Sequence, residues 1–345
     1  MTPGQALLWP FSVAYGAGGR LWASCYRTGI FRQKRLKGAV VSVGNLTVGG
    51  TGKTPMVVWL AKRFSAAGVK TAVLCRGYRP LPHGTALADS SGIAEGWNDE
   101  AALLHQRLGP AVEIGANANR YAKGRDLESS GVKCFVLDDG FQHLQLARDV
   151  DIVMIDATNP FGGGHVILAG RLREPTSALR RADIVVITRS DHAPAVEAVI
   201  RRHSNAPIFY AQTELVSLEV RGLMGSLVEK FRPEGKKFFA FCGIGNPGAF
   251  LSDLKSWGFS IVGHANFRDH HLYTKHDLAD LEARAMAAGA DALICTEKDI
   301  YDLTSLKTER IPICFCRISL RFNDEDALWR TIVDAIHRKK PGVLQ

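Results

Sequence analysis

The sequence predicts an α/β protein made of two lobes, a parallel-sheet domain and a smaller α/β domain. Short continuous apolar runs, which are typical of buried parallel strands, alternate with helical patterns over the first part of the chain. This pattern breaks near residues 212–235, where an alternating stretch at 216–220 is followed by a charged turn. A second, smaller alternation begins at residue 238, and 345 residues are enough for two domains.

The elements follow in order from these patterns. The first lobe opens with a strand at 39–43, a glycine-rich loop and a helix at 56–64. It continues with strands at 71–75, 133–137, 151–155 and 182–187 and a helix at 99–108. The second lobe has strands at 238–241, 260–263, 292–295 and 311–316 and helices at 248–257, 275–288 and 324–337.

The loop after the first strand is the most informative segment, because residues 44–55 read Gly-Asn-Leu-Thr-Val-Gly-Gly-Thr-Gly-Lys-Thr-Pro. In such a loop the backbone N–H groups point at a bound phosphate, here those of Gly49, Gly50, Thr51 and Gly52. Lys53 would reach the outer phosphates, and the Thr54 hydroxyl would bind Mg²⁺. The alternative is a glycine-rich turn without a ligand, since Thr47 replaces a common glycine. The flanking strand and helix favour a P-loop NTPase-like domain.

Positive charge is concentrated at the N-terminal end. The first 88 residues contain twelve Lys or Arg and no Asp or Glu, although the net charge of the whole chain is only +9. A bound nucleotide phosphate would balance only a small part of this surplus of positive charge. Anionic lipid, a phosphorylated substrate or nucleic acid could account for the rest.

Residues 1–38 combine an uncharged, aromatic stretch with basic flanking residues. Apolar side chains recur there at helical spacing: Leu7, Phe11, Ala14, Leu21, Trp22 and Cys25. The stretch is too short and too interrupted to span a bilayer, and it is a poor signal peptide. A helix lying in a membrane interface fits the pattern, and a helix packed on the domain core is the alternative.

The seven cysteines show no Cys-x-x-Cys spacing, and most lie in strand-like runs. We therefore expect buried thiols, without a disulfide framework or a zinc site.

Two acidic residues, Asp138 and Asp139, follow the strand at 133–137. In a P-loop protein the carboxyl end of a second strand supplies the carboxylate that holds the metal ion. A solvated turn is the alternative. Gln142 and His143 come directly after in a tight turn, and His143 alone would be an ordinary structural histidine.

Asp99 and Glu100 begin a helix, where acidic residues are common for structural reasons. The functional alternative for this pair is a general base. Arg120 is either an anion clamp or surface charge. Arg171 and Arg173 lie in a glycine-punctuated loop and look like phosphate contacts, although loops are often basic, and Glu174 follows them.

The second lobe contains Asp-His-His at 269–271, between a strand and a helix. Adjacent histidines seldom bind one metal ion, so a catalytic or orienting histidine is favoured over a metal site, and a structural Asp/His loop at the helix start is the alternative. The segment Thr-Glu-Lys-Asp at 296–299 lacks the spacing of a guanine-specific loop, which argues against a GTPase.

Together these segments resemble the tetraacyldisaccharide 4′-kinase family of lipid A biosynthesis. The matching motifs lie in the family's order and cover most of the chain, at 43–55, 99–100, 138–143, 170–175, 243–247, 267–273 and 296–299. The Thr47 deviation is itself a feature of the family. Asn98 departs from it, because many members have Gly before the Asp-Glu pair.

The resemblance implies transfer of the ATP γ-phosphate to the 4′-hydroxyl of tetraacyldisaccharide 1-phosphate, which gives lipid IVA. It implies ATP and Mg²⁺ as cofactors. Lys53 and Thr54 would bind phosphates and Mg²⁺, Asp138 and Asp139 would organise the metal, and Asp99 would be the base, oriented by His270. The substrate and the transferred phosphate would be contacted by Glu100, Arg120, Gln142, His143, Arg171 and Glu174.

The resemblance also implies a place and an organisation for the protein. We expect a peripheral monomer on the cytoplasmic face of a bacterial inner membrane, contacting anionic lipids and the acylated disaccharide, and no nucleic acid. The expected domains are an amphipathic membrane-associating segment at 1–38, a P-loop kinase domain at 39–215, a hinge β-ribbon at 216–236 and a smaller α/β domain at 237–345.

Two alternatives come from other classes. A ParA/MinD-like ATPase switch at membrane or DNA shares the glycine loop, but it has a Lys where this chain has Val48. A non-enzymatic nucleic-acid binder would use the basic N-terminal end, but the chain lacks a recognisable nucleic-acid motif.

Overall fold

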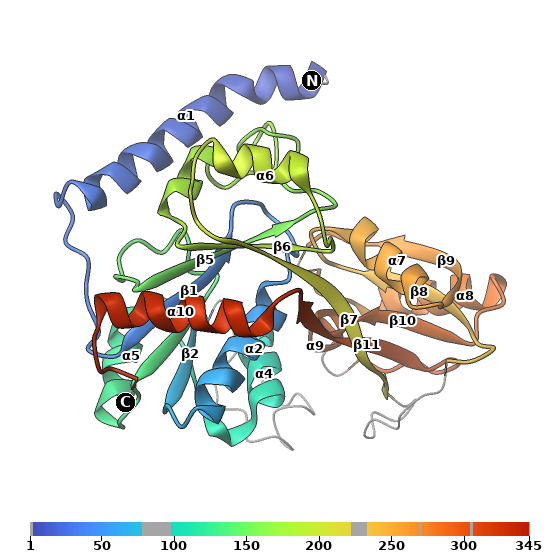
Figure 1. Ribbon diagram of the computed structural model, residues 1–345. Coiled ribbons are helices and arrows are strands. Elements are labelled where there is room, and N and C mark those ends of the chain that lie inside the picture. Colours follow the sequence, from blue (N-terminus) through green and yellow to red (C-terminus); the bar gives the residue numbers. More distant parts are fainter. Residues whose placement is uncertain (1–2, 78–97, 222–232, 270, 304–305, 345) are drawn as a thin grey trace. The chain divides into compact units, whose positions relative to one another are not determined.

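The computed structural model describes residues 3–77, 98–221, 233–269, 271–303 and 306–344, with side chains from residue 8 onward (Figure 1). The chain forms two compact units. Unit 1 comprises Met1–Arg76, Leu108–Gln212 and Leu320–Gln345, and unit 2 comprises Gly77–Arg107 and Thr213–Ser319. The α/β fold class predicted from the sequence is confirmed.

Unit 1 is built on a parallel sheet with the strand order β3-β2-β4-β1-β5-β6-β7. Its strands are β1 (Ala39–Asn45), β2 (Thr71–Cys75), β3 (Val112–Ala116), β4 (Cys134–Asp138), β5 (Val150–Asp156), β6 (Ile184–Thr188) and β7 (Ile208–Arg221). Every residue of β1, β2, β4, β5 and β6 is buried, as expected of strands covered on both faces.

The sheet order puts β1 between β4 and β5, so the loops after β1 and β4 leave the same edge of the sheet. The helices and short turns of unit 1 are α1 (Pro3–Arg27), α2 (Lys53–Ala66), η1 (Gly109–Ala111), α5 (Arg120–Ser129), η2 (Thr176–Arg181), α6 (Pro194–Arg201) and α10 (Glu325–Lys339). The sequence patterns missed β3, α5 and α6.

The last helix, α10, belongs to unit 1, whereas the sequence assigned it to the smaller domain. Its first turn contacts α2, where Trp59 donates to Glu325 at 2.9 Å and Arg63 lies 3.0 Å from Asp326. The Trp329 ring packs on Phe64 with their ring centroids 4.8 Å apart. The chain therefore returns to its first unit through β11 (Ile313–Phe322), although α10 is far from the rest of that unit in the sequence.

Unit 2 has a second parallel arrangement, in which β10 lies between β11 and β8, and β9 pairs with β8. Its elements are α4 (Asp99–Leu108), β8 (Lys237–Cys242), α7 (Pro247–Ser256), β9 (Ser260–Asn266), α8 (Lys275–Ala287), β10 (Ala292–Thr296), α9 (Glu297–Asp302) and β11 (Ile313–Phe322). The unit boundaries fall within β7 and β11.

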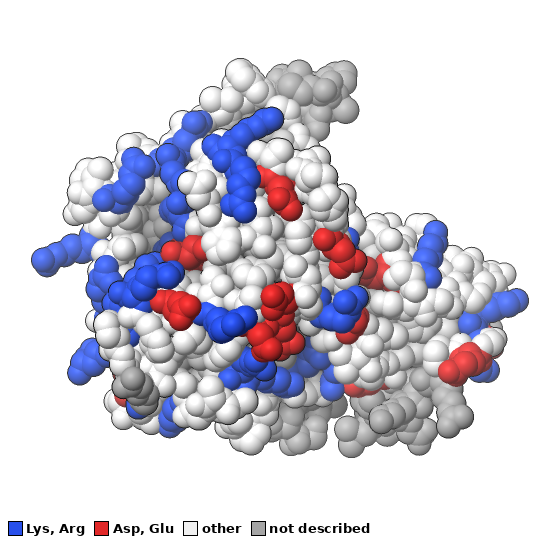
Figure 2. All heavy atoms as spheres, viewed as in Figure 1, with Lys and Arg blue, Asp and Glu red and all other residues white. Residues whose placement is uncertain are grey.

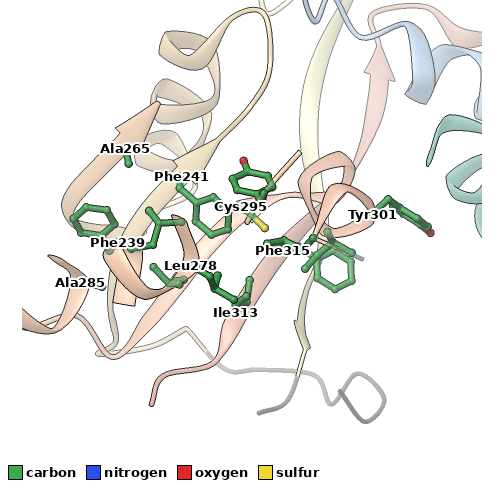
Figure 3. Packing of buried hydrophobic residues seen from close by; sticks show 14 of the residues in the cluster. Phe239, Phe241, Ala265, Leu278, Ala285, Cys295, Tyr301, Ile313 and Phe315 are labelled. Atoms are coloured by element: carbon green, nitrogen blue, oxygen red, sulfur yellow. The ribbon is translucent and has the colours of Figure 1, made fainter. Parts of the chain in front are cut away.

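The core of unit 2 gathers side chains from its sheet and from α8, with Phe239, Phe241, Leu278 and Ile313 among them (Figure 3). Ala102 and Leu103 of α4 belong to the same cluster. Arg107 at the end of α4 also lies 3.2 Å from Glu297. These contacts explain why α4 groups with unit 2, although the sequence placed it in the first domain.

All seven cysteines are free thiols; six are buried, as expected, and Cys25 is half-buried. Within the described residues, no helix combines the length and apolar character needed to cross a bilayer.

Candidate active site

The glycine loop connects β1 to α2, as the sequence predicted. Gly52 precedes the helix with φ of 83°, a conformation that glycine adopts without steric cost. Gly44 lies so close to the loop after β4 that a Cβ there would be 2.6 Å from the Cβ of Phe141. The strand, the loop and the helix N-terminus thus have the geometry of an anion-binding loop.

Side chains beneath the loop fix its shape. The Asn45 amide donates to the Gly49 carbonyl at 3.3 Å and to the Thr51 hydroxyl at 3.1 Å. Thr188, the last residue of β6, donates to the Thr51 carbonyl at 3.3 Å. Thr51 is buried, so it supports the loop from within through its side chain.

Asp139 lies between two cations at the end of β4. Its carboxylate oxygens are 3.6 Å from the Lys53 ammonium and 2.6 Å from the Arg173 guanidinium. Although burial opposes ionisation, these two charges hold the pKa of Asp139 well below its usual range. Its φ of 48° lies in the left-handed region, which Asp tolerates better than most residues.

Asp138 is the last residue of β4 and pairs in register with Val43 of β1. It is buried, and so is Arg120, the first residue of α5, whose helix Asn119 caps. Burial lowers the pKa of Arg120, while the charges of Asp138 and Asp139 oppose that shift. The Arg120 Nε has no hydrogen-bond partner among the described groups.

The segment at 170–175 runs along the glycine loop. Leu172 pairs with Thr47 in an antiparallel bridge, and the Arg173 N–H donates to the Leu46 carbonyl at 2.7 Å. Arg171 donates to the Val48 carbonyl through Nε at 3.3 Å and Nη2 at 2.9 Å. The segment is therefore a strap that holds the first half of the loop.

A polar chain links this strap to the base of the loop. Arg181 binds both oxygens of the buried Glu174, at 2.8 and 2.9 Å. Gln142 donates to Glu174 at 3.1 Å and to the Asn45 carbonyl at 3.0 Å. The chain fixes the turn after β4 relative to the end of β1.

His143 is half-buried in a positively charged environment. Burial, reinforced by Arg120, Arg148 and Arg76, lowers its pKa to about 4. The imidazole is therefore neutral at physiological pH and can accept or donate a hydrogen bond without carrying charge.

In unit 2, Asp99 and Glu100 form the first turn of α4, and the Lys298 ammonium lies 3.9 Å from Glu100. Burial and the neighbouring carboxylates Asp99 and Asp299 raise the pKa of Asp302 to about 8. The expected partner of Asp99, His270, lies outside the described residues.

A family profile described as Tetraacyldisaccharide-1-P 4'-kinase (LpxK) matches residues 4–337. The chain belongs to this family. Curated relatives named Tetraacyldisaccharide 4'-kinase agree over most of their length. The relative from Geobacter metallireducens is 41% identical over 86% of this chain and 88% of its own length. The relative from Syntrophus aciditrophicus is 36% identical over 96% of this chain and 93% of its own length.

A solved LpxK structure from Aquifex aeolicus, in complex with ATP, matches with a TM-score of 0.69 and 28% identity, covering 96% of this chain and 99% of that one. The agreement extends over both units of the chain. Membership of the kinase family confirms the resemblance inferred from the motifs and does not favour the ParA/MinD-like alternative.

Two residues expected at the substrate have structural contacts in this kinase. Arg171 binds the backbone of the glycine loop, and both carboxylate oxygens of Glu174 accept hydrogen bonds from Arg181. Asp299 likewise caps α9 and accepts hydrogen bonds from the Gly243 N–H and the Tyr273 hydroxyl.

Arg173 was expected as a phosphate contact together with Arg171, and in the structure it pairs with Asp139. Arg173 follows Arg171 by two positions, so in an extended strap both side chains lie on one face. Arg181 was missed as a site residue. No sequence pattern pointed to Arg181, which lies in the next element and reaches Glu174 only through the fold.

The described residues include no cluster of three His, Cys, Asp or Glu side chains able to hold a metal ion. Mg²⁺ in a phosphate loop needs fewer protein ligands, because nucleotide oxygens and water complete its coordination. A threonine hydroxyl at the start of α2 and the strand-end Asp138 have the oxygen chemistry that this ion prefers, so the residues fit Mg²⁺ bound together with a nucleotide.

Proposed function

We propose that this chain transfers the γ-phosphate of ATP to the 4′-hydroxyl of tetraacyldisaccharide 1-phosphate. The observation that carries the proposal is the built phosphate loop with Lys53 at its end, in a chain that the LpxK family profile matches from residue 4 to residue 337. The LpxK structure from Aquifex aeolicus, a protein of the same family, was solved in complex with ATP.

Each part of the loop has a task in this reaction. Backbone N–H groups at 49–52 and the N-terminus of α2 bind the β- and γ-phosphates, and Lys53 neutralises the γ-phosphate. Thr54 and Asp138 would hold Mg²⁺, which offsets the charge that develops on the phosphate oxygens. Asp139 keeps the Lys53 ammonium near the loop.

Asp99 is the proposed base. As the 4′-oxygen bonds to the γ-phosphorus, the bond from that phosphorus to the β,γ-bridging oxygen breaks, ADP leaves, and the hydroxyl proton passes to Asp99. We propose that His270 orients Asp99. Glu100 would contact the acceptor from the same turn of α4.

Arg120 is the best candidate in unit 1 for binding the transferred phosphate. It is almost fully buried, it lies beside the two strand-end carboxylates, and its Nε lacks an acceptor among the described groups. Gln142 and the neutral His143 would complete the polar surroundings of the acceptor. Arg171 and Glu174 would act indirectly, by shaping the loop.

The N-terminal segment supports a peripheral association with membrane. Large apolar side chains are exposed along α1 and just after it, including Phe11 at 63%, Leu21 at 68% and Ile30 at 71%. Lys and Arg side chains gather around the same region (Figure 2). An apolar helix with basic flanks binds in the interface of an anionic bilayer, here the cytoplasmic face of the inner membrane.

We further propose that residues 216–236 form the hinge ribbon; the end of β7, up to Arg221, is its first part, and residues 222–232 lie outside the described residues. The acting species would be a monomer that needs no nucleic acid.

The experiment is a transfer assay. Purified protein in detergent receives Mg²⁺, γ-labelled ATP and tetraacyldisaccharide 1-phosphate, beside an Asp99→Ala variant. We expect label in the lipid with the wild type and a loss of turnover in the variant, with ATP affinity little changed. ATP hydrolysis without labelled lipid would overturn the proposed function, and equal loss of turnover and ATP affinity would overturn the role of Asp99.

A further inference from the structure

A cavity of about 260 Å³ lies in unit 1, between the last turns of α1 and the η2 turn. Its lining includes Arg20, Ser24 and Arg27 from α1 and Ser177, Arg180 and Arg181 from η2. Glu174 and Pro175, at the end of the strap, close one side. The reaction proposed above does not use this cavity.

The charge of the cavity is strongly positive. Arg181 is paired with Glu174, so these two charges cancel. Within the described part of the chain, no carboxylate lies within ion-pair distance of Arg20, Arg27 or Arg180. Arg20 donates only to the Gly16 carbonyl at 3.3 Å, and Arg27 to the Ser24 hydroxyl at 3.3 Å. Three guanidinium groups thus line one cavity without an anion to balance them.

The donors in the cavity fit a phosphate group. Guanidinium groups bind phosphate oxygens in pairs of parallel hydrogen bonds, and the two serine hydroxyls can supply further donors. The volume is below the roughly 300–1,000 Å³ of pockets that enclose whole small molecules. A phosphate with its immediate substituents would therefore fit better than a complete nucleotide.

The orientation of α1 indicates which kind of molecule would supply the phosphate group. One face of the helix contacts the body of unit 1, since Ser12 donates to the Val166 carbonyl at 2.8 Å. Arg20, Ser24 and Arg27 continue this face at spacings of three and four. The side chains of Phe11, Tyr15 and Trp22 lie on the opposite face and are exposed.

A helix with an exposed apolar face lies about 5–10 Å deep in the boundary between headgroups and acyl chains. The opposite face of α1, and the cavity on it, would then be at the level of the lipid phosphates. We propose that this cavity is a binding site for the phosphate group of a lipid headgroup. The proposal rests on the proposed membrane association and does not depend on phosphoryl transfer.

Two lipids could supply that phosphate: a phospholipid of the surrounding bilayer, or the acceptor lipid through its own 1-phosphate. The test compares Arg27→Gln/Arg180→Gln, which removes two charges from the cavity, with Arg32→Gln/Arg35→Gln, which removes two exposed charges outside its lining. Both variants have the same net charge, so non-specific attraction to an anionic surface falls by a similar factor.

The first arm measures binding of the full chain to phosphatidylcholine vesicles that contain phosphatidic acid, or the same surface charge from a carboxylate lipid. The second arm measures KM for tetraacyldisaccharide 1-phosphate and for its analogue without the 1-phosphate. Melting temperatures establish that both variants fold like the wild type.

If a bilayer phospholipid occupies the cavity, the wild type and the Arg32→Gln/Arg35→Gln variant bind vesicles with phosphatidic acid several-fold more tightly than vesicles with the carboxylate lipid. The Arg27→Gln/Arg180→Gln variant, here called the cavity variant, loses this preference. If the acceptor occupies it, the cavity variant raises KM several-fold for the 1-phosphate lipid alone. Equal behaviour of the two variants in both arms would overturn the proposal. The vesicle arm needs no ATP. If the wild type lacks kinase activity but still prefers vesicles with phosphatidic acid, only the proposed function is contradicted.

Discussion

The Oδ2 atom of Asp139 lies 2.6 Å from the Nη1 atom of Arg173, and this ion pair joins the end of β4 to the strap that holds the glycine loop. The other carboxylate oxygen is 3.6 Å from the Lys53 ammonium. One carboxylate therefore pairs with both cations, and the three groups together keep one positive charge. An arriving γ-phosphate would compete with Asp139 for Lys53 while Arg173 keeps Asp139 in place.

Arg173→Ala should impair this arrangement. Without its partner, Asp139 would interact more strongly with Lys53, which would then be less available to phosphate. We expect kcat/KM for ATP to fall by about tenfold or more, as for loss of a charge-assisted hydrogen bond. Steady-state kinetics at saturating lipid acceptor would measure this. Arg173→Lys retains the charge and should recover part of the activity, and unchanged kinetics in the alanine variant would contradict the role.

Arg171→Ala should act on the nucleotide rather than on the lipid. Its guanidinium holds the Val48 carbonyl, so its loss would loosen the first half of the loop. We expect KM for ATP to rise several-fold, with KM for the acceptor nearly unchanged. A rise in KM for the acceptor alone would contradict this role and would support the substrate contact that the sequence predicted for Arg171.

Asp302→Asn should make unfolding less sensitive to pH. The raised pKa of about 8 exceeds the value of about 3.9 expected in an unfolded chain. The stability contributed by this group is therefore complete below pH ~4 and is lost as pH rises through about 8. The variant avoids burying a charge, so its melting temperature relative to wild type should be higher at pH 9 than at pH 6. Asp280→Asn, at an exposed position, is the control and should show no such difference.

Gly44→Ala should destabilise unit 1. A Cβ at this position would lie 2.6 Å from the Phe141 Cβ and 2.7 Å from its backbone nitrogen, so the loop after β4 would have to shift. We expect a loss of roughly 1–3 kcal/mol in the free energy of unfolding, measured by denaturant titration. Gly18→Ala is the control, because a Cβ in that part of α1 meets nothing within 4 Å. A neutral effect at Gly44 would show that the loop after β4 adapts easily.

The sequence predicted those parts of the site that depend on local order. The glycine loop is continuous from Gly44 to Thr54, and Asp138 and Asp139 directly follow a buried strand, so neighbours in sequence define both features. The contacts of Arg171 and Glu174 were not predictable in this way. Their partners, Val48 and Arg181, are set by how the strap folds back on the loop.

The allocation of α4 and α10 to the two units failed for a similar reason. Both helices have ordinary amphipathic patterns. Such a pattern predicts that one face of the helix is buried, but not in which unit's core that face packs. Leu103 packs into the core of unit 2, and Trp329 packs on α2 of unit 1. Only the completed fold specifies these partners.

The central claim is that the chain phosphorylates a lipid hydroxyl with ATP. Its most direct test is the stoichiometry of the reaction, with the ADP released compared with the new phosphate monoester at the 4′ position, identified by phosphorus NMR of the purified lipid. We predict one ADP for each 4′-phosphate formed, and no ADP above background when the acceptor is omitted. ADP released without a 4′-phosphate, or a phosphate found at another position, would contradict the account.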